Sequence, residues 1–442
     1  MSIMGAANFR GGVHPEYRKE LTASLAITAA SIPQKVVIPL HQHTGAPCEP
    51  LVKVGDPVKT GQKIGDSEAF VSAPVHASIS GTVTAIEPCN HPLGRKVTAI
   101  IIESDGRDEW CSELEPVEKV DDLSPEEIRA LIRSAGIVGL GGAAFPAHVK
   151  LSPPEGKAID TVIINGAECE PYLTADHRLM LEKPDEIVFG LELIMKALGA
   201  GRGIIGIEDN KPDALRVMRQ AVEGKSDMSV VALKTKYPQG AEKMLIQVTT
   251  RRVVPSGGLP LDVGVVNHNV GSAVAITEAL KKGKPLIERV VTVTGEGVRR
   301  PANLLVRLGT LVSELIDYCG GLKEETCKVI TGGPMMGLAQ PTTDLPVIKG
   351  TSGIVALTSE DAAFYENGSC IRCAACVRTC PINLVPTFIA QAAEHGLYDR
   401  AEKLHAADCI ECGCCSYICP ARIPLTQWIR IAKAEVLARR KG

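Results

Sequence analysis

The stretch CIECGCCSYICP, residues 409–420, places five cysteines within twelve positions, and CIRCAACVRTCP, residues 370–381, repeats its spacing. Both follow C-x2-C-x2-C-x3-C-P, the spacing of bacterial [4Fe–4S] ferredoxins. Three neighbouring thiolates can hold one face of a cubane cluster, and in two-cluster proteins the last cysteine of each run binds the other cluster. We therefore predict two [4Fe–4S] clusters, one held by Cys370, Cys373, Cys376 and Cys419, the other by Cys409, Cys412, Cys415 and Cys380.

A pair of zinc sites is the alternative for these cysteines. Zinc sites usually combine two Cys-x2-4-Cys pairs across a longer loop, which a triple run closed by Cys-Pro does not provide. The fifth cysteine, Cys414, lies outside the repeat, and its counterpart in the first run is Ala375. We expect Cys414 to be a small buried residue rather than a ligand.

Composition limits the remaining possibilities. The 442 residues suggest about three domains; they are 45% hydrophobic and 22% charged, which permits sizeable cores. A net charge of −3 and 3% aromatic residues give no reason to expect nucleic acid as a partner. No apolar run has the length of a membrane span, and the first thirty residues lack the features of a signal peptide. We therefore expect a cytoplasmic protein whose fifteen cysteines serve metal or redox chemistry.

Residues 382–408, between the two cysteine runs, are rich in Ala, Leu and Glu and are predicted to be helical. The clusters are thus expected in a helical ferredoxin-like domain. Two neighbouring cubanes carry single electrons, so a source and a sink are needed elsewhere in the chain.

Helix and strand patterns alternate from about residue 122 to residue 283. Ser124, Pro125 and Glu127 predict a capped helix start, and DTVIING, residues 160–166, predicts a short buried strand. Further alternation predicts an α/β domain with a mainly parallel sheet. Ligands of such domains lie beyond the carboxyl ends of the strands.

The loop GLGGAAFP, residues 139–146, can bring main-chain N–H groups close to a phosphate or a flat ring. It is not the Rossmann fingerprint, since no strand precedes it and the third glycine is missing. Taken alone, it would more often be a simple tight turn.

Three later segments change this interpretation: INGAECEP (164–171), YPQGAEKMLI (237–246) and VVNHNVGSAVAI (265–276). The four segments, in this order, resemble the FMN- and NADH-binding subunit of respiratory complex I. The resemblance implies that FMN and NADH are held by residues matching that family's motifs, namely Gly139, Gly141, Gly142, Ala143, Phe145, Pro146, Asn165, Glu168, Glu170, Tyr237, Gly240, Glu242 and Asn269. The chain departs from those motifs at Ala144, Ala167, Ala241, Gly271 and Ser272.

Residues 52–87 have the two-half strand pattern of lipoyl and biotinyl carrier domains, but their tip, DSEAFVSAP (66–74), has no lysine to carry a cofactor. We therefore expect a structural barrel. Residues 290–321 resemble the small β-grasp (SLBB) domain that follows the flavin domain in complex I. TGGPMMG, residues 331–337, resembles a connector loop, and we assign it no cofactor.

The sequence thus predicts a multidomain α/β protein with a lysine-less barrel (1–110), a Rossmann-type FMN and NADH domain (111–285), a β-grasp domain (286–355) and a helical two-cluster domain (356–442). This order resembles the C subunit of the Rnf ion-pumping electron-transport complex, as does the opening NFRGGVHPEYRKELT (8–22). The resemblance implies a peripheral subunit on the cytoplasmic face of a bacterial membrane, with the other subunits of the complex, NAD(H) and, indirectly, ferredoxin as partners.

The implied chemistry is ferredoxin:NAD+ oxidoreduction. NADH gives up two electrons as hydride, a cubane takes one, and FMN can do both, so FMN belongs between them. No side-chain nucleophile, acid or base is required. Two alternatives remain open: a soluble flavin and iron–sulfur reductase such as a cobalamin reductase, and a flavin-free electron wire.

Overall fold

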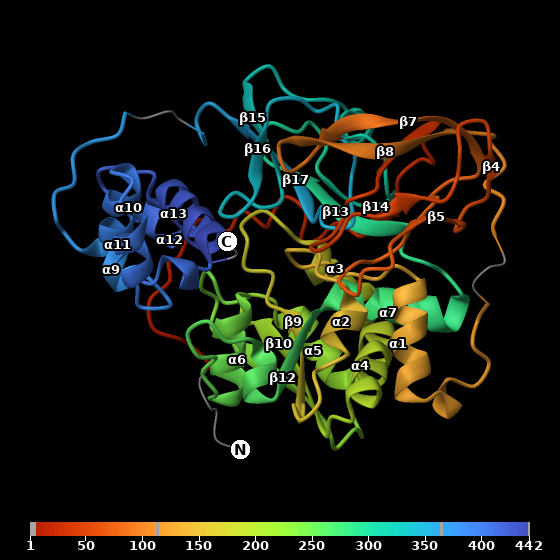
Figure 1. Cartoon of the computed structure of the whole chain (residues 1–442), viewed down its shortest axis with the longest axis horizontal. Coiled ribbons are helices and arrows are strands. Elements are labelled where there is room, and N and C mark those ends of the chain that lie inside the picture. Colours follow the sequence, from red (N-terminus) through yellow and green to blue (C-terminus); the bar gives the residue numbers. More distant parts are fainter. Residues whose placement is uncertain (1–5, 112–114, 363–365, 441–442) are drawn as a thin grey trace.

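The computed structural model describes residues 6–111, 115–362 and 366–440. Figure 1 shows the chain arranged in four groups of elements, with the helical cluster domain and the barrel on opposite sides of the molecule. Within the described residues, no helix is both long and apolar enough to cross a membrane.

The barrel consists of two small sheets with the orders β2-β8-β7-β4 and β3-β5-β6. Val36, Ile38, Ile64, Ile100 and Ile102 form its separate core. The strands are β2 (Lys35–Pro39), β3 (Glu49–Pro50), β4 (Pro57–Val58), β5 (Lys63–Asp66), β6 (Val75–His76), β7 (Gly81–His91) and β8 (Arg95–Ser104). Buried and exposed residues alternate at the start of β7, as expected for a strand with one face on a core.

The tip of the barrel is docked on the neighbouring domain. Arg133 donates hydrogen bonds to Asp66 Oδ1 (3.1 Å) and to the main-chain oxygen of Ser67 (2.8 Å). His148 Nε2 lies 3.1 Å from the main-chain oxygen of Phe70. The tip that carries the cofactor in carrier domains is therefore a fixed contact here, as expected for a structural barrel.

A four-stranded parallel sheet with the order β11-β10-β9-β12 forms the centre of the second group. Its elements are β9 (Thr161–Gly166), β10 (Arg202–Glu208), β11 (Met228–Leu233), β12 (Val265–Asn269), α1 (Pro125–Ser134), α2 (Ala147–Lys150), α3 (Ala175–Glu182), α4 (Pro184–Leu198), α5 (Pro212–Ala221), α6 (Glu242–Thr250), α7 (Val270–Lys282) and the 3-10 turns η1 (Val120–Asp122) and η2 (Pro260–Val263). The chain runs from β9 outward to β11 and returns to β12 on the other side of β9. The topological switch point, where such folds bind ligands, therefore lies at the carboxyl ends of β9 and β12.

Local signals explain these elements. Ser124 and Glu127 form the predicted capping box of α1, with Pro125 in the first turn. The helix α4 ends at Gly199, which adopts the left-handed conformation (φ 65°) that glycine accepts without a Cβ clash. The strands β9 and β10 are almost wholly buried, which accounts for their continuous apolar runs.

The third group is a six-stranded sheet with the order β1-β14-β13-β17-β15-β16. It comprises β13 (Glu288–Thr294), β14 (Ala302–Arg307), α8 (Val312–Tyr318), β15 (Thr326–Thr331), β16 (Leu338–Gln340) and β17 (Gly353–Thr358), joined by β1 (Ile27–Ala29). The predicted order of strand, strand and helix is therefore present. The sheet also takes β1 from residues assigned to the barrel domain, and β17 spans the expected division at residue 355. The four domain boundaries stay predictions.

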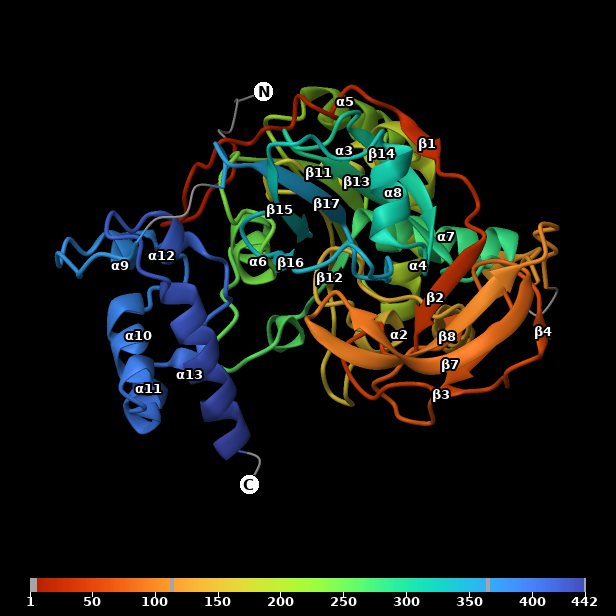
Figure 2. The same cartoon turned by 90° about the horizontal axis from the view of Figure 1, so that it is seen from above.

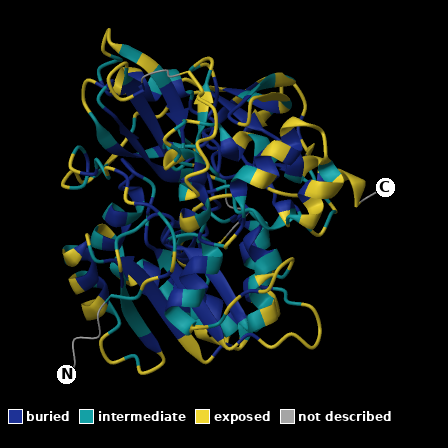
Figure 3. Ribbon diagram, turned by 90° about the vertical axis from the view of Figure 1, so that its left-hand side faces the viewer, coloured by how far each residue is buried: buried dark blue, intermediate teal, exposed yellow. Residues whose placement is uncertain are grey.

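The cluster domain is helical, as predicted. Its helices are α9 (Ala375–Thr379), α10 (Pro386–Glu394), α11 (Tyr398–Lys403), α12 (Cys414–Tyr417), α13 (Leu425–Arg439) and the 3-10 turn η3 (Ala406–Asp408). Ile389 and Ile429 are buried between α10 and α13. Figure 3 shows that the helices beside the C-terminus carry much exposed surface, whereas the sheets are largely buried.

Residues 6–26 form an extended N-terminal strap. Figure 2 shows this red segment reaching from the side of the cluster domain across the molecule to β1. Lys19 is buried, and its ammonium donates to the main-chain oxygens of Glu170 (2.9 Å) and Leu173. The strap therefore contacts the flavin-type domain before its chain enters the third sheet.

Candidate functional site

The glycine-rich loop lies at the carboxyl end of β12. Gly139 N donates to Phe145 O (2.9 Å), which closes the loop. A Cβ on Gly141 would lie 2.9 Å from Asn269 Nδ2, so this position has no room for a side chain. A Cβ on Gly142 would meet nothing within 4 Å. The loop thus packs tightly against β12 at one glycine and borders open space at the next.

The barrel contacts the same loop. Thr44 Oγ1 donates to Ala143 O (2.7 Å), and Thr44 N donates to Ala144 O (3.3 Å). Ala144 has φ 51°, which explains why glycine stands at this position in the motif that the loop resembles. From the third sheet, Arg289 donates to Leu140 O (3.2 Å). Phe145 and Pro146 end the loop where α2 begins, so three domains fix its main chain.

Buried polar atoms without partners lie on the adjacent strand. Among the described residues, both ring nitrogens of His268 and Oδ1 of Asn267 make no hydrogen bond, although both side chains are buried. Burial lowers the pKa of His268 to about 3, so the ring is neutral. Lys150 donates to Asn267 O (3.1 Å) and pairs with Glu242 (3.0 Å). An open glycine cradle beside unsatisfied polar atoms and a lysine suits a phosphorylated flavin such as FMN.

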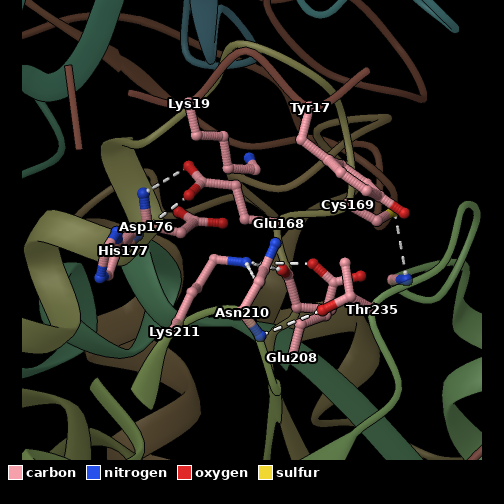
Figure 4. Close-up of polar contacts among 12 residues, drawn as sticks. Tyr17, Lys19, Glu168, Cys169, Asp176, His177, Glu208, Asn210, Lys211 and Thr235 are labelled. Atoms are coloured by element: carbon pink, nitrogen blue, oxygen red, sulfur yellow. Dashed lines mark hydrogen bonds and ion pairs between the residues drawn. The ribbon is translucent and has the colours of Figure 1, made fainter. Parts of the chain in front are cut away.

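The remaining predicted residues meet at the same edge of the sheet. Asn165 Nδ2 donates to Gly240 O (2.9 Å), which joins two of the predicted segments. Glu168 has φ 46° and accepts from the first amides of α3, Asp176 N (2.7 Å) and His177 N (3.1 Å). Figure 4 shows this carboxylate pointing at α3. Glu168 is therefore occupied as a helix cap here.

Asn269 N-caps α7, as expected, and accepts from Gly271 N (2.9 Å). Its Nδ2 donates to Asp176 Oδ2 (2.7 Å). Burial, with the neighbouring Glu168 carboxylate, raises the pKa of Asp176 to about 7. No sequence pattern distinguishes Asp176, because an aspartate in the first turn is typical of any helix.

A buried ion pair lies behind this edge. Lys211 and Glu208 are joined at 3.0 Å, and their side chains are 1% and 0% exposed. Lys211 also donates to Ala167 O (2.7 Å), which fixes the loop after β9. Figure 4 shows Lys211 beside Glu208. No sequence signal marks this pair, since Lys211 precedes Pro212 in an ordinary helix start.

Glu170 and Tyr237 face the cluster domain. Glu170 accepts from Met335 N (3.0 Å) and Met336 N (2.9 Å), and burial raises its pKa to about 7. Tyr237 donates from its hydroxyl to Cys412 O (2.8 Å). A Cβ on Gly413 would lie 2.9 Å from Met335 O. The connector loop 331–337 is thus more than a turn, because it fills the contact between the flavin-type and cluster domains.

One predicted ligand set lines a single cavity. Its walls include Cys380, Cys409, Cys412 and Cys415, from both cysteine runs. Burial raises the pKa of Cys409 to about 12 when no metal is bound. Within the described residues, no three Cys, His, Asp or Glu side chains converge on a point for one metal ion. Four thiols around a common space fit a [4Fe–4S] cluster.

The second predicted set lies nearer the surface. Cys370 and Cys373 are exposed, Cys419 is half-buried and Cys376 is buried. The pKa of Cys376 is raised by burial and by the Cys419 thiol, so residues from the two runs interact electrostatically here too.

Cys414 is fully buried. Its thiol donates to Tyr237 O (3.9 Å), and it packs in one cluster with Cys169 and Val13. It also lines the cavity of the Cys409 set. The fifth cysteine therefore lies at the contact between domains, in agreement with the expectation of a small buried residue.

Four family models match successive parts of the chain: an RnfC barrel sandwich hybrid domain (7–107), a Nuo51 FMN-binding domain (132–278), an SLBB domain (290–339) and a 4Fe-4S dicluster domain (362–420). They confirm the predicted multidomain α/β architecture and the predicted cofactor classes, FMN and [4Fe–4S].

Named relatives extend over nearly the whole chain. The C subunit of the proton-translocating ferredoxin:NAD(+) oxidoreductase complex of Clostridium ljungdahlii is 52% identical over 97% of this chain and 94% of its own. The C subunit of the Na(+)-translocating ferredoxin:NAD(+) oxidoreductase complex of Acetobacterium woodii is 50% identical over 98% of both chains. The solved structure of an NAD+-reducing [NiFe]-hydrogenase in the H2-reduced state overlaps at a TM-score of 0.47, with 15% identity over 73% of this chain and 65% of that chain.

These relatives decide between the alternatives that the sequence left open. They support membership of an ion-translocating ferredoxin:NAD(+) oxidoreductase complex over a soluble cobalamin reductase, and the FMN-binding match argues against a flavin-free wire. At this identity and coverage, the chain belongs to the RnfC family, the C subunits of ion-translocating ferredoxin:NAD+ oxidoreductase (Rnf) complexes.

Proposed function

We propose that this chain transfers electrons between its two [4Fe–4S] clusters and NAD+/NADH through FMN, as part of a ferredoxin:NAD+ oxidoreductase. The observation that carries the proposal is the direct contact between the two candidate sites. Glu170, from the flavin-type domain, binds the connector loop, and Tyr237, from the same domain, binds the Cys412 main chain. A cradle for a flavin and a cavity for a cluster thus share a boundary.

The flavin is held by the loop Gly139–Pro146 and by residues that meet at the switch point, Asn165, Gly240, Glu242 and Asn269, with Lys150 and His268 added. Glu168 supports this edge by capping α3. FMN, when bound, exchanges hydride with NAD(H) and single electrons with clusters. The chain supplies main-chain donors at Gly142, a positive Lys150 and a neutral His268. Loop contacts from Thr44 and Arg289 keep this cradle in place.

The clusters are held by the two crossed sets, Cys370, Cys373, Cys376, Cys419 and Cys409, Cys412, Cys415, Cys380. The cavity of the Cys409 set is lined by Cys412, whose main-chain oxygen binds Tyr237, whereas Cys370 and Cys373 are exposed. With clusters bound, the exposed Cys370 set would be open to a partner that supplies electrons, and the Cys409 set would face the flavin-type domain.

The partners are the other subunits of the complex, with ferredoxin acting through them, and the chain sits peripherally on the cytoplasmic side of the bacterial membrane. The relatives from Clostridium ljungdahlii and Acetobacterium woodii, which are named as subunits of such complexes, support this placement.

The test is anaerobic purification of the full chain after reconstitution with FMN and with iron and sulfide. We expect flavin and broad iron–sulfur absorption, about eight iron atoms per chain, and bleaching of both by NADH. Co-purification with washed membranes is expected from native cells and not from cells lacking the other subunits. A loaded chain that NADH does not reduce would contradict the proposal.

A further inference from the structure

The strap residues 9–13 lie between the flavin-type domain and the cluster domain. Val13 and Tyr237 exchange two main-chain hydrogen bonds, Val13 N to Tyr237 O (2.8 Å) and Tyr237 N to Val13 O (2.9 Å). The preceding amide, Gly12 N, donates to Thr379 O (2.8 Å), one residue before Cys380. Adjacent amides of the strap therefore bind two different domains.

Two adjacent glycines make this approach possible. Gly11 and Gly12 have φ 82° and 78°, in the left-handed region that glycine tolerates. A Cβ on Gly11 would lie 2.8 Å from Thr379 O and 3.0 Å from Cys380 O, and a Cβ on Gly12 would lie 2.5 Å from Tyr237 O. A side chain on Gly11 would push the strap away from the cluster domain, and a side chain on Gly12 would push it away from the flavin-type domain.

The strap is anchored firmly on the flavin-type domain. Phe9 is 7% exposed and belongs to the core cluster that includes Leu233 and Leu245. Lys236 donates to Phe9 O (3.0 Å), and its ammonium lies 4.8 Å from the centre of the Phe9 ring. Ala7 pairs with Leu233 of β11. Ala7 and Phe9, at the start of the strap, are thus packed against the flavin-type domain.

The other side of the strap reaches the proposed ligands. Cys380 is the proposed ligand that the first cysteine run contributes to the Cys409 set. Its main-chain oxygen would lie 3.0 Å from a Cβ on Gly11. Tyr237, bonded to Val13, donates to the main-chain oxygen of Cys412, which lines the same cavity as Cys380. Two of the four proposed ligand residues are therefore held against one short stretch of chain.

We propose that residues 9–13 are a positioning element that sets the gap between the flavin cradle and the Cys409 cluster, and with it the rate of electron transfer between them. This inference rests on the proposed function. In the reaction concerned, NADH loses a hydride and becomes NAD+; two electrons pass through the flavin, one reduces each cluster, and one proton is released.

The test compares the full chain with Gly11→Ala and Gly12→Ala, each reconstituted anaerobically with FMN and with iron and sulfide. The matched control is Gly94→Ala, since Gly94 also has a positive φ (74°) but no atom within 4 Å of an added Cβ. In stopped-flow mixing with NADH, we expect unchanged flavin bleaching in all variants. Cluster bleaching should slow about tenfold or more in the two strap variants only, because small misplacements have large rate effects.

A second readout does not depend on the loaded protein. Hydrogen exchange of the apoprotein should show loss of protection at the Val13 and Tyr237 amides in Gly12→Ala and retention in Gly94→Ala. If a glycine variant fails to fold, Lys236→Met decides. It removes the hydrogen bond to Phe9 O and the ammonium contact with the Phe9 ring, and it is expected to slow cluster bleaching in the same way.

The outcomes separate the two claims. A wild-type chain in which NADH bleaches flavin and clusters, with strap variants equally fast and equally protected, overturns the positioning role alone. A wild-type chain that binds neither cofactor overturns the proposed function, and the positioning role with it.

Discussion

The hydroxyl of Tyr237 donates a 2.8 Å hydrogen bond to the main-chain oxygen of Cys412. The first residue belongs to a segment predicted to hold flavin, and the second is a predicted cluster ligand. Glu170, from another predicted flavin segment, binds the connector loop on the same side. Residues chosen for a flavin site thus form its boundary with a cluster site.

Tyr237→Phe should weaken this boundary while leaving both cofactor sites occupied. The change leaves the buried Cys412 carbonyl without its donor, which should cost about 1–2 kcal/mol. Differential scanning calorimetry and iron analysis measure the two effects. Tyr318→Phe is the control, because that hydroxyl donates to Ala29 O (3.3 Å) from an exposed position where water can replace it. Equal unfolding temperatures for both variants would show that the Tyr237 hydroxyl does not stabilise the contact.

Cys414→Ala should keep both clusters, whereas Cys412→Ala and Cys415→Ala should each lose one. We expect iron near eight atoms per chain in the first variant and about four in the other two. The reason is that the first run has Ala375 at the equivalent position. Iron analysis and electron paramagnetic resonance of the reduced proteins distinguish the variants. Loss of half the iron in Cys414→Ala, with full iron in Cys415→Ala, would mean that Cys414 and not Cys415 is the cluster ligand.

Gly142→Val should fold normally yet lose FMN. The Cβ of the new side chain would meet no atom of the apoprotein within 4 Å, so the side chain would extend into the open space beside the loop. Gly141→Val should instead destabilise the apoprotein, because its Cβ would lie 2.9 Å from Asn269 Nδ2. Flavin fluorescence titration and thermal unfolding measure the two effects separately. Full FMN binding by Gly142→Val would mean that the flavin lies elsewhere.

Asp176→Asn should remove part of the loss of stability at alkaline pH. The pKa of Asp176 is raised from 3.8 to about 7, so the folded chain binds this proton more tightly than the unfolded chain. That stabilisation is complete below about pH 4 and is lost as pH rises through 7. The wild-type apoprotein should therefore unfold at lower temperature at pH 8 than at pH 6.5, and the variant should show a smaller difference. Burial also raises the pKa of Glu170 to about 7, so Glu170 is expected to account for the pH dependence of stability that remains in the variant. Identical pH profiles would exclude Asp176 as the source.

The barrel should carry neither lipoyl nor biotinyl groups. Its tip has no lysine, and Arg133 and His148 hold the tip against the flavin-type domain. Intact mass spectrometry of protein from native cells is expected to show no such mass increment on residues 52–87. Either increment would contradict a structural role for the barrel.

Short-range patterns predict most of the architecture. The capping box at Ser124 and Glu127, the parallel strands and the helices between the cysteine runs are all present, because their signals lie within a few residues of one another. The strand β1 has no such signal, since Ile27–Ala29 pairs with β14, far along the chain. The contact made by the TGGPMMG loop could not be predicted from the sequence for the same reason, because its partner Glu170 is remote in sequence.

The cluster prediction follows from local sequence, because cysteine spacing sets thiolate geometry, whereas the flavin prediction needs the glycine loop together with three later segments. How the two sites meet depends on the tertiary structure. Glu168 caps a helix, Tyr237 turns toward Cys412, and the glycines at 11 and 12 fit between two domains. The contacts of Tyr237 and of the two glycines join segments hundreds of residues apart, which come together through packing and leave no periodic signal in the sequence.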